Sequence, residues 1–321
     1  MTTLNDIYGP VKDDLKLVEA SLEQIARANL PLLSEMLEFS LLNVGKRLRP
    51  VLTLLSGKFY DYNLKLLVPM AAAVEVLHIG TLVHDDIIDS AAMRHGKEAV
   101  HCKYGTNSAI LLGDYLFSRA GSLAAMTNNL RVIKRFSETL MTISGGELKE
   151  ARLNFIPASA RDNYFLWIRD KTACLFVLAA ECGGVLSTCP EDQITALKEY
   201  ALNFGLAFQI IDDTLDFVGD QNMLGKPVGS DLMEGAITLP FIIYAEQHPT
   251  DGVIAKIVMQ GRKELVPQAV EKVCSSGAID VCRKIAGQFC AKACDSLKNL
   301  PDCEARKSLI ALAKFVVDRE H

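Results

Sequence analysis

The sequence predicts an all-α protein, and three features of its 321 residues indicate this class. Apolar residues recur at the three- and four-residue spacing of a helix face, as between Val11 and Phe59. The alternating pattern typical of strands is scarce throughout. Turn-forming residues fall in the gaps between the periodic runs, at Pro50, Pro69, Gly105, Pro157, Pro190, Pro227, Pro249 and Pro301. Since no repeat or low-complexity linker divides the chain, we expect one domain over residues 1–321, built from ten or more helices.

Composition narrows the function classes. Half of the residues are apolar and the mean hydropathy is +0.18, which predicts helices that are apolar over much of their circumference. The net charge of −5 argues against a general nucleic-acid binder. We expect no transmembrane segment, because no apolar run free of charges reaches about 18 residues. The first residues lack the layout of a signal peptide, so we expect a cytoplasmic protein.

The nine cysteines form no regular disulfide framework and are expected to be reduced. Cys290 and Cys294 are one helical turn apart, but no second ligand pair stands nearby. We interpret them as structural thiols rather than metal ligands.

Taken in order, the first polar cluster is GKRLRP at residues 45–50. Lys46 and Arg49 are three residues apart, so both side chains can converge on one anion. Basic residues at a helix start are more often surface decoration, since the helix dipole there favours anions. Alone, the cluster is a moderate signal for phosphate binding.

The segment from Leu77 to Gly105 contains the first of two acidic motifs, DDIID. On a helix, Asp85 and Asp89 share a face and Asp86 lies beside them, so the like charges repel unless a cation neutralises them. Ligands that are all oxygen favour Mg²⁺, which bridges carboxylates to phosphates. His78 precedes Asp85 by two turns, either as a core residue or as a ligand.

The middle of the chain predicts a long helix over residues 107–125, and then an apolar helix headed by Lys171 and Thr172. A cation and a hydroxyl at that position would face whatever anion the aspartates hold.

A second acidic motif, DDTLD, places Asp212, Asp213 and Asp216 after another apolar helix. One such motif is usually a solvated helix face, but two copies favour a shared metal site. The motif is followed by GKPVGSD, where Lys226 is the expected phosphate partner. Beyond Tyr244 the amphipathic pattern predicts scaffold or dimer surface.

Together these motifs resemble those of the trans-type, head-to-tail isoprenyl (polyprenyl) diphosphate synthases, over about residues 45 to 240 and in the same order. The resemblance implies an isoprenoid-synthase fold, a bundle of helices around a large central cavity, with the two aspartate motifs facing each other. It also implies about three Mg²⁺ ions per active site and usually a homodimer. The expected ligands are small isoprenoid diphosphates, with no nucleic acid and at most a transient membrane contact for product release.

The resemblance also implies roles for individual residues. Metal ions would be held by Asp85, Asp89 and Asp212, with Asp86, Asp213 and Asp216 beside them. Isopentenyl diphosphate would lie on Lys46, Arg49, His78 and His95. The allylic diphosphate would be held by Arg94, Lys171, Thr172, Gln209 and Lys226. Metals and cations would stabilise the departing pyrophosphate, so no side-chain nucleophile is needed.

Two positions depart from the pattern of the family. The usual pair of arginines before glycine is Arg94-His95 here, and Ala236 stands where a lysine is usual. Both changes remove positive charge. We expect weaker diphosphate binding than in a fully matched relative, and a Michaelis constant that depends on pH through His95.

Product length in these enzymes depends on how far the apolar tail can run below the first motif. The residues four and five positions before Asp85 are Thr81 and Gly80, which are both small. The tail could then pass Leu77, roughly 6 Å deeper along the helix, so we expect a product of about C30 to C50. Geranylgeranyl or farnesyl diphosphate is the shorter alternative.

Two other functions stay open. A terpene cyclase shares the aspartate-rich helix, but normally lacks the second motif and the GKRLRP cluster. A subunit of a heteromeric prenyl synthase would explain the missing cations, but such subunits usually lose the aspartates that are intact here.

Overall fold

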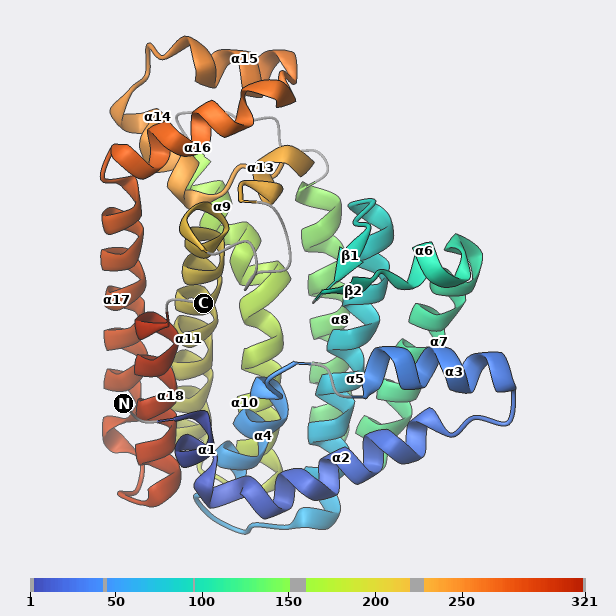
Figure 1. The fold of residues 1–321 in the computed structure, drawn as a ribbon. Coiled ribbons are helices and arrows are strands. Elements are labelled where there is room, and N and C mark those ends of the chain that lie inside the picture. Colours follow the sequence, from blue (N-terminus) through green and yellow to red (C-terminus); the bar gives the residue numbers. More distant parts are fainter. Residues whose placement is uncertain (1–2, 43–44, 95, 151–159, 220–227, 320–321) are drawn as a thin grey trace.

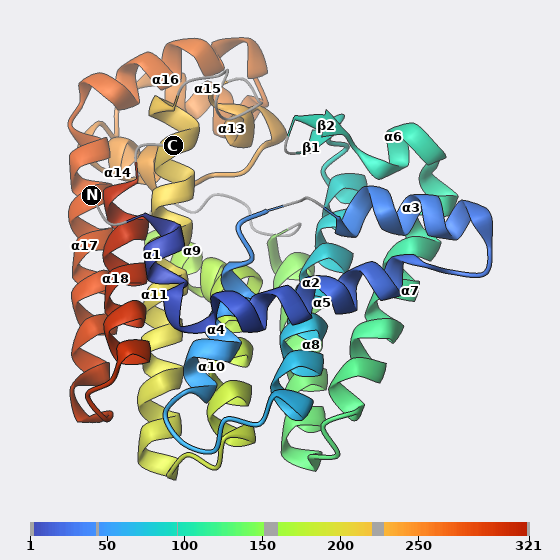
Figure 2. The same ribbon diagram turned by 60° about the horizontal axis from the view of Figure 1, so that its bottom comes forward.

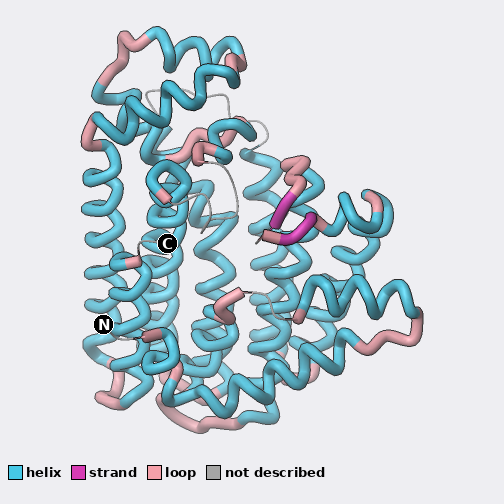
Figure 3. The backbone as a smooth tube through the Cα atoms, viewed as in Figure 1, coloured by secondary structure: helices cyan, strands magenta, loops and turns pink. Residues whose placement is uncertain are grey.

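The computed structural model describes residues 3–42, 45–94, 96–150, 160–219 and 228–319. Helices dominate this part of the chain, as predicted (Figures 1 and 3). The first half comprises α1 (Leu4–Ile7), η1 (Gly9–Val11), α2 (Lys12–Ala26), α3 (Pro31–Leu41), α4 (Leu48–Gly57), α5 (Leu64–Ile88), α6 (Val100–Tyr104), α7 (Thr106–Ala125) and α8 (Leu130–Glu150). The second half comprises α9 (Ala160–Ile168), η3 (Arg169–Ala173), α10 (Cys174–Leu186), α11 (Glu191–Val218), α13 (Ser230–Glu234), α14 (Leu239–Gln247), α15 (Gly252–Gln260), η4 (Lys263–Leu265), α16 (Val266–Ser275), α17 (Ala278–Ser296), η5 (Leu297–Asn299) and α18 (Glu304–Asp318).

One small sheet interrupts this pattern in the described chain. Strands β1 (Met93–Arg94) and β2 (Lys97–Glu98) pair antiparallel directly after α5. They are too short to give an alternating signal in the sequence, and Figure 3 shows them as an isolated hairpin beside the helices.

The central helix α5 is apolar around its whole circumference and is therefore buried. It begins where the Asn63 side chain accepts a hydrogen bond from the Lys65 amide at 3.1 Å. By length and composition it is the one helix of the described residues that could cross a membrane, but 72% of its apolar window lies inside the protein. It packs against α7 and α4, and α2 crosses it on the outside (Figures 1 and 2).

The buried side chains form two clusters that share α11. One cluster surrounds α4, α5 and α10, and the other lies among α9, α14, α16 and the upper parts of α11 and α17. Residues from Ile194 to Phe204 belong to the first cluster and those from Leu206 to Phe217 to the second. Because one continuous helix supplies both, the arrangement favours the single-domain prediction.

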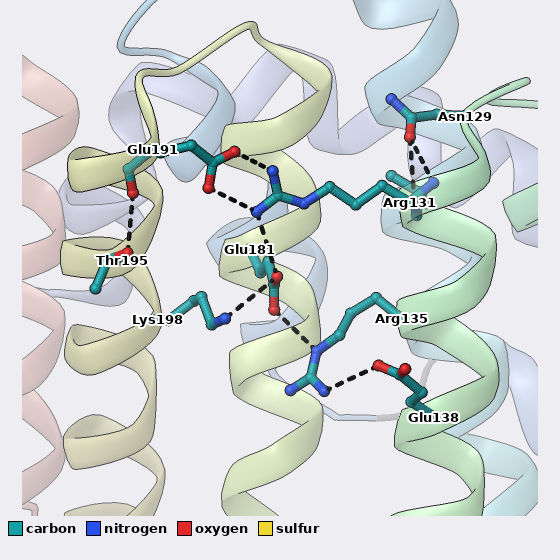
Figure 4. Close-up of polar contacts among 9 residues, drawn as sticks. Asn129, Arg131, Arg135, Glu138, Glu181, Glu191, Thr195 and Lys198 are labelled. Atoms are coloured by element: carbon teal, nitrogen blue, oxygen red, sulfur yellow. Dashed lines mark hydrogen bonds and ion pairs between the residues drawn. The ribbon is translucent and has the colours of Figure 1, made fainter.

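An ion-pair network around the buried Glu181 fixes α8, α10 and α11 relative to one another (Figure 4). Glu181 of α10 is only 6% exposed, and its carboxylate lies 2.8 Å from Arg135 Nε, 3.4 Å from Lys198 Nζ and 3.7 Å from Arg131 Nη2. Arg131 also pairs with Glu191, which opens α11. Since Lys198 precedes Asp212 by roughly 21 Å along the helix, the network stabilises the end of the bundle remote from the second acidic motif.

All nine cysteines are unpaired, as predicted.

Candidate active site

Both acidic motifs lie at the C-terminal ends of long helices. Helix α5 ends at Ile88 with Asp89 as its C-cap, and α11 ends at Val218, two residues after Asp216. The two helices run in the same direction and end on the same side of the bundle (Figure 1). A helix C-terminus carries partial negative charge, which destabilises carboxylates placed there. These motifs therefore require cations more strongly than the same residues elsewhere on a helix.

In the first motif, Asp86 is buried against a protein partner, whereas Asp85 is half-buried and Asp89 is exposed. Asp86 is 3% exposed and accepts a hydrogen bond from Arg94 Nε at 2.7 Å, with Nη2 at 2.5 Å. Burial raises the pKa of Asp85 to about 7, an effect that the positive charge of Lys171 opposes. Asp89 is exposed. A bound cation would restore the ionised form of Asp85 and use oxygens that the protein leaves available.

The second motif also has buried aspartates that the protein holds by hydrogen bonds and another aspartate that is exposed. Asp213 is 2% exposed and accepts hydrogen bonds from the Tyr164 hydroxyl at 2.6 Å and from Gln209 Nε2 at 2.7 Å. Asp216 is 1% exposed and accepts from the Ser230 hydroxyl at 2.7 Å. Asp212, in contrast, has an exposed side chain.

Residues of η3 connect the two motifs. The Lys171 ammonium lies 3.0 Å from a Glu147 carboxylate oxygen and acts electrostatically on Asp85. The neighbouring Thr172 hydroxyl donates to Gln209 Oε1 at 2.7 Å, and Gln209 in turn holds Asp213. The π-helical turn of η3 is a geometry often found at functional sites. The structure thus links Asp85 through Lys171 and its neighbour Thr172 to Gln209 and Asp213.

The basic cluster at the start of α4 lies beside the second motif. Asp212 acts electrostatically on both Lys46 and Arg49, so the two predicted phosphate ligands do share one region. Burial lowers the pKa of Arg49 to about 10, and its guanidinium carbon lies 4.4 Å from the centre of the Phe176 ring. Its buried Nε has no hydrogen-bond partner among the described residues. An anion would supply that partner.

Arg47, which lies between Lys46 and Arg49 in the sequence, points into the core instead and anchors the basic cluster. Its backbone has a left-handed φ of 53°, and its side chain lies 2.7 Å from Glu19 and 2.9 Å from Glu75. Arg47 also donates to the Leu41 carbonyl oxygen at 2.7 Å. Because these groups hold Arg47 in the core, its neighbour Lys46 is left exposed.

Sequence patterns did not point to two further functional groups. Arg319 follows α18 and contacts Asp212, with Nη2 3.2 Å from Oδ1. Tyr164 of α9 orients Asp213. Neither belongs to a motif, so only the spatial arrangement reveals them. Predicted ligands His95 and Lys226 lie outside the described residues, while His78 lies half-buried on α5.

The small gate residues on α5 are already covered by neighbours. A Cβ atom on Gly80 would lie 2.8 Å from Cε1 of Phe117, so the α7 ring occupies the space beside this glycine. Thr81 is 9% exposed and its hydroxyl donates to the His78 carbonyl at 2.7 Å. Leu77 is fully buried. Whether these residues limit product length stays a prediction.

A separate cavity of about 280 Å³ opens on the side of α5 that faces α3 and the hairpin. Phe39, Val83 and Val100 form part of its apolar wall, while Asp86 and Arg94 lie on its polar side. It adjoins the first motif.

The donor groups fit a hard divalent cation that shares its ligands with a substrate. In the described residues, no three His, Cys, Asp or Glu side chains lie close enough to hold an ion alone. The available donors are carboxylate oxygens, and Mg²⁺ characteristically keeps waters and bridges a few carboxylates to phosphate. Substrate oxygens and water would complete the coordination.

Comparison with known proteins decides the family. The polyprenyl synthetase family profile matches residues 30–274. This chain belongs to the polyprenyl synthetase family. The synthase is 35% identical over 316 residues to heptaprenyl diphosphate synthase component 2 from Bacillus subtilis (strain 168), covering 98% of this chain and 90% of that relative.

Solved structures agree. A polyprenyl synthase from Caulobacter crescentus CB15, complexed with calcium and isoprenyl diphosphate, superposes with a TM-score of 0.94 at 30% identity, covering 100% of this chain and 99% of the other. Geranylgeranyl pyrophosphate synthetase from Pyrococcus horikoshii Ot3 gives 0.86 at 32% identity, covering 98% and 99%. The fold is therefore that of the isoprenoid synthases, and the chain is a trans-prenyltransferase of a family that uses divalent metals, a polyprenyl diphosphate synthase.

Proposed function

We propose that this synthase condenses isopentenyl diphosphate head-to-tail with an allylic diphosphate, in the presence of Mg²⁺. The observation that carries the proposal is the pair of outer carboxylates, Asp85 and Asp212, at two helix ends joined through Lys171 and Thr172. When bound, Mg²⁺ would supply neutralisation of the charge that develops on the departing pyrophosphate.

The roles of the aspartates are proposed to differ. Asp85, Asp89 and Asp212 would contact the metal ions directly, because they are the more exposed members of the two motifs; Arg319 also contacts Asp212. Asp86, Asp213 and Asp216 would position the helix ends through Arg94, Tyr164 and Ser230.

The chain's own cations would hold the two substrates. Lys46, Arg49 and His78 would bind isopentenyl diphosphate, with the orphan Nε of Arg49 available to it. Lys171 and Thr172 would orient the allylic diphosphate against the aspartates. The proposed contacts of His95 and Lys226, and the loss of charge at Ala236, rest on the sequence alone.

We further propose a long product, of about C30 to C50, because no aromatic side chain stands at Gly80 or Thr81. Relatives with similar identity include both long-chain and geranylgeranyl enzymes, so the shorter product is the alternative.

We propose a homodimer. Exposed apolar side chains gather on α7 and α8, at Leu111, Tyr115, Met126, Leu130, Met141 and Leu148. Light scattering after size-exclusion chromatography tests this, and a monomeric mass at micromolar concentration would contradict it. The name "component 2" of the Bacillus subtilis relative favours a second candidate, a catalytic subunit that needs a different partner chain.

The test is to incubate the purified chain alone with Mg²⁺, isopentenyl diphosphate and farnesyl diphosphate, and to size the products. Chain elongation supports the proposal, a cyclic hydrocarbon would indicate a terpene cyclase, and no product would favour the two-subunit enzyme. Asp85→Asn should abolish elongation, whereas Asp13→Asn, on the exposed face of α2, should not.

A further inference from the structure

Helices α5 and α7 pack closely beside the first acidic motif, and each places one ring against a glycine of the other. A Cβ atom on Gly113 of α7 would collide with the ring of His84 on α5. In the same way, a Cβ atom on Gly80 of α5 would lie 2.8 Å from Cε1 of Phe117 on α7. The two rings also meet edge to face, with their centroids 5.1 Å apart. Neither glycine can therefore carry a side chain unless the opposite ring moves.

A hydrogen bond fixes the His84 ring on α7 as well. Its Nε2 lies 3.1 Å from the Ile110 carbonyl oxygen, and because a carbonyl only accepts, His84 donates through a proton on Nε2. The Asp114 carboxylate lies 3.8 Å from the same atom, which is too far for a second hydrogen bond. Packing and one directed hydrogen bond thus hold this ring against α7.

His84 directly precedes Asp85 on α5, so the position of its ring affects the first acidic motif. Consecutive side chains on a helix are about 100° apart, and His84 and Asp85 therefore point in different directions from one rigid turn. The ring lies between the two helices and keeps the last turns of α5 at a fixed distance from α7. Without the ring, this end of α5 could shift or rotate and would carry the Asp85 carboxylate with it.

We propose that His84 is a positioning residue: seated against Gly113 of α7, it orients the end of α5 so that Asp85 is directed at the metal ions. This rests on the proposed role of Asp85 as a metal ligand. His84 acts only through Asp85 and touches neither metal nor substrate. Groups that orient a metal ligand typically change metal affinity or activity about 10- to 100-fold when they are removed.

The test changes the ring from both helices. His84→Ala removes the ring, whereas Gly113→Ala keeps the ring but fills the space in which it lies. His84→Gln retains an N–H group that can reach the Ile110 carbonyl oxygen. Gly121→Ala is the matched control on α7, because its Cβ atom would lie 3.8 Å from the Phe136 ring, an ordinary contact. Both glycine substitutions favour the helix, so a purely structural effect of the added methyl group would be the same in both.

Isothermal titration calorimetry measures the binding of inorganic pyrophosphate in excess Mg²⁺. We expect His84→Ala and Gly113→Ala to weaken binding about tenfold, His84→Gln to recover most of this loss, and Gly121→Ala to match the wild type. The double variant His84→Ala/Gly113→Ala should bind no more weakly than His84→Ala alone, because the methyl group then meets no ring. The Michaelis constant for isopentenyl diphosphate, which is proposed to lie on Lys46 and Arg49, should stay near the wild-type value.

Asp85→Asn separates the failure of this proposal from the failure of the metal site, and thermal unfolding identifies the variants that remain folded. If Asp85→Asn loses binding while Gly113→Ala binds like Gly121→Ala, His84 does not position the motif, and the metal site stands. Additive losses in the double variant would overturn the proposal in the same way. If Asp85→Asn binds like the wild type, Asp85 is not a metal ligand and both proposals fail. Should His84→Ala unfold, the comparison of the two glycine variants decides.

Discussion

The ion pair beneath the phosphate cluster gives the most quantitative prediction. Arg47 and Glu75 are 7% and 6% exposed in their side chains, and their atoms Nη1 and Oε1 are 2.9 Å apart. Replacing Arg47 with methionine fills a similar volume but leaves Glu75 charged and buried without its partner. Breaking a buried pair from one side costs about 3 to 5 kcal/mol. We expect Arg47→Met to lower the free energy of unfolding by that amount.

The same change should weaken isopentenyl diphosphate binding. The negative charge of Glu75 already raises the pKa of Arg49 against the effect of burial. Without Arg47, Glu75 would attract the Arg49 guanidinium, whose Nε is otherwise unpaired. The Michaelis constant for isopentenyl diphosphate should rise, while that for the allylic substrate should stay near the wild-type value.

The double variant Arg47→Met/Glu75→Gln separates the charge from the packing. Removing both charges should restore at least about 2 kcal/mol of the lost stability, because a buried amide is far less costly than an unpaired carboxylate. Urea unfolding and steady-state kinetics measure the two effects, with Lys16→Met, from an exposed pair on α2, as the control. If the single and double variants are equally stable and have equal Michaelis constants, the reasoning is refuted.

Three further predictions concern product length and the C-terminal helices. Thr81→Phe should shorten the product, as measured by chromatography, whereas Thr81→Val should leave the product length unchanged. Thr81→Phe tests the gate better than Gly80→Phe, because a side chain at Gly80 would collide with Phe117. Phe117→Ala should lengthen the product, and an unchanged length would show that this ring does not limit the tail. Hydrogen bonds from Lys272 and then Tyr244 lower the pKa of Asp251 to about 2. The ionised Asp251 therefore adds to the free energy of unfolding above pH 4, and this addition is lost as the pH falls towards 2. After allowance for screening, Asp251→Asn should cost about 1 kcal/mol at pH 7 in thermal unfolding, with the difference vanishing near pH 2.

Patterns that depend on neighbouring residues could be predicted from the sequence, and contacts between distant segments could not. Apolar runs before the two motifs predicted the helices that carry them, and the motif spacing placed the aspartates on their faces, but Pro69, expected between two helices, lies inside α5. The contact between Arg319 and Asp212 joins residues 107 positions apart, and Arg319 belongs to no motif. The inward turn of Arg47 depends on a left-handed backbone and on Glu19 and Glu75, which local spacing does not reveal.

The division of labour among the aspartates follows from their position at helix ends. The last turn of a helix has free carbonyl groups and partial negative charge, so three carboxylates there cannot all remain ionised without compensation. Protein donors compensate the inner member of each motif, through Arg94 for Asp86 and through Tyr164 for Asp213. Those bonds fix the two helix ends and leave Asp85 half-buried beside Lys171 and Asp212 exposed beside Arg319. A diphosphate that binds together with its own cations would therefore neutralise the negative charge of the carboxylates at the two helix ends.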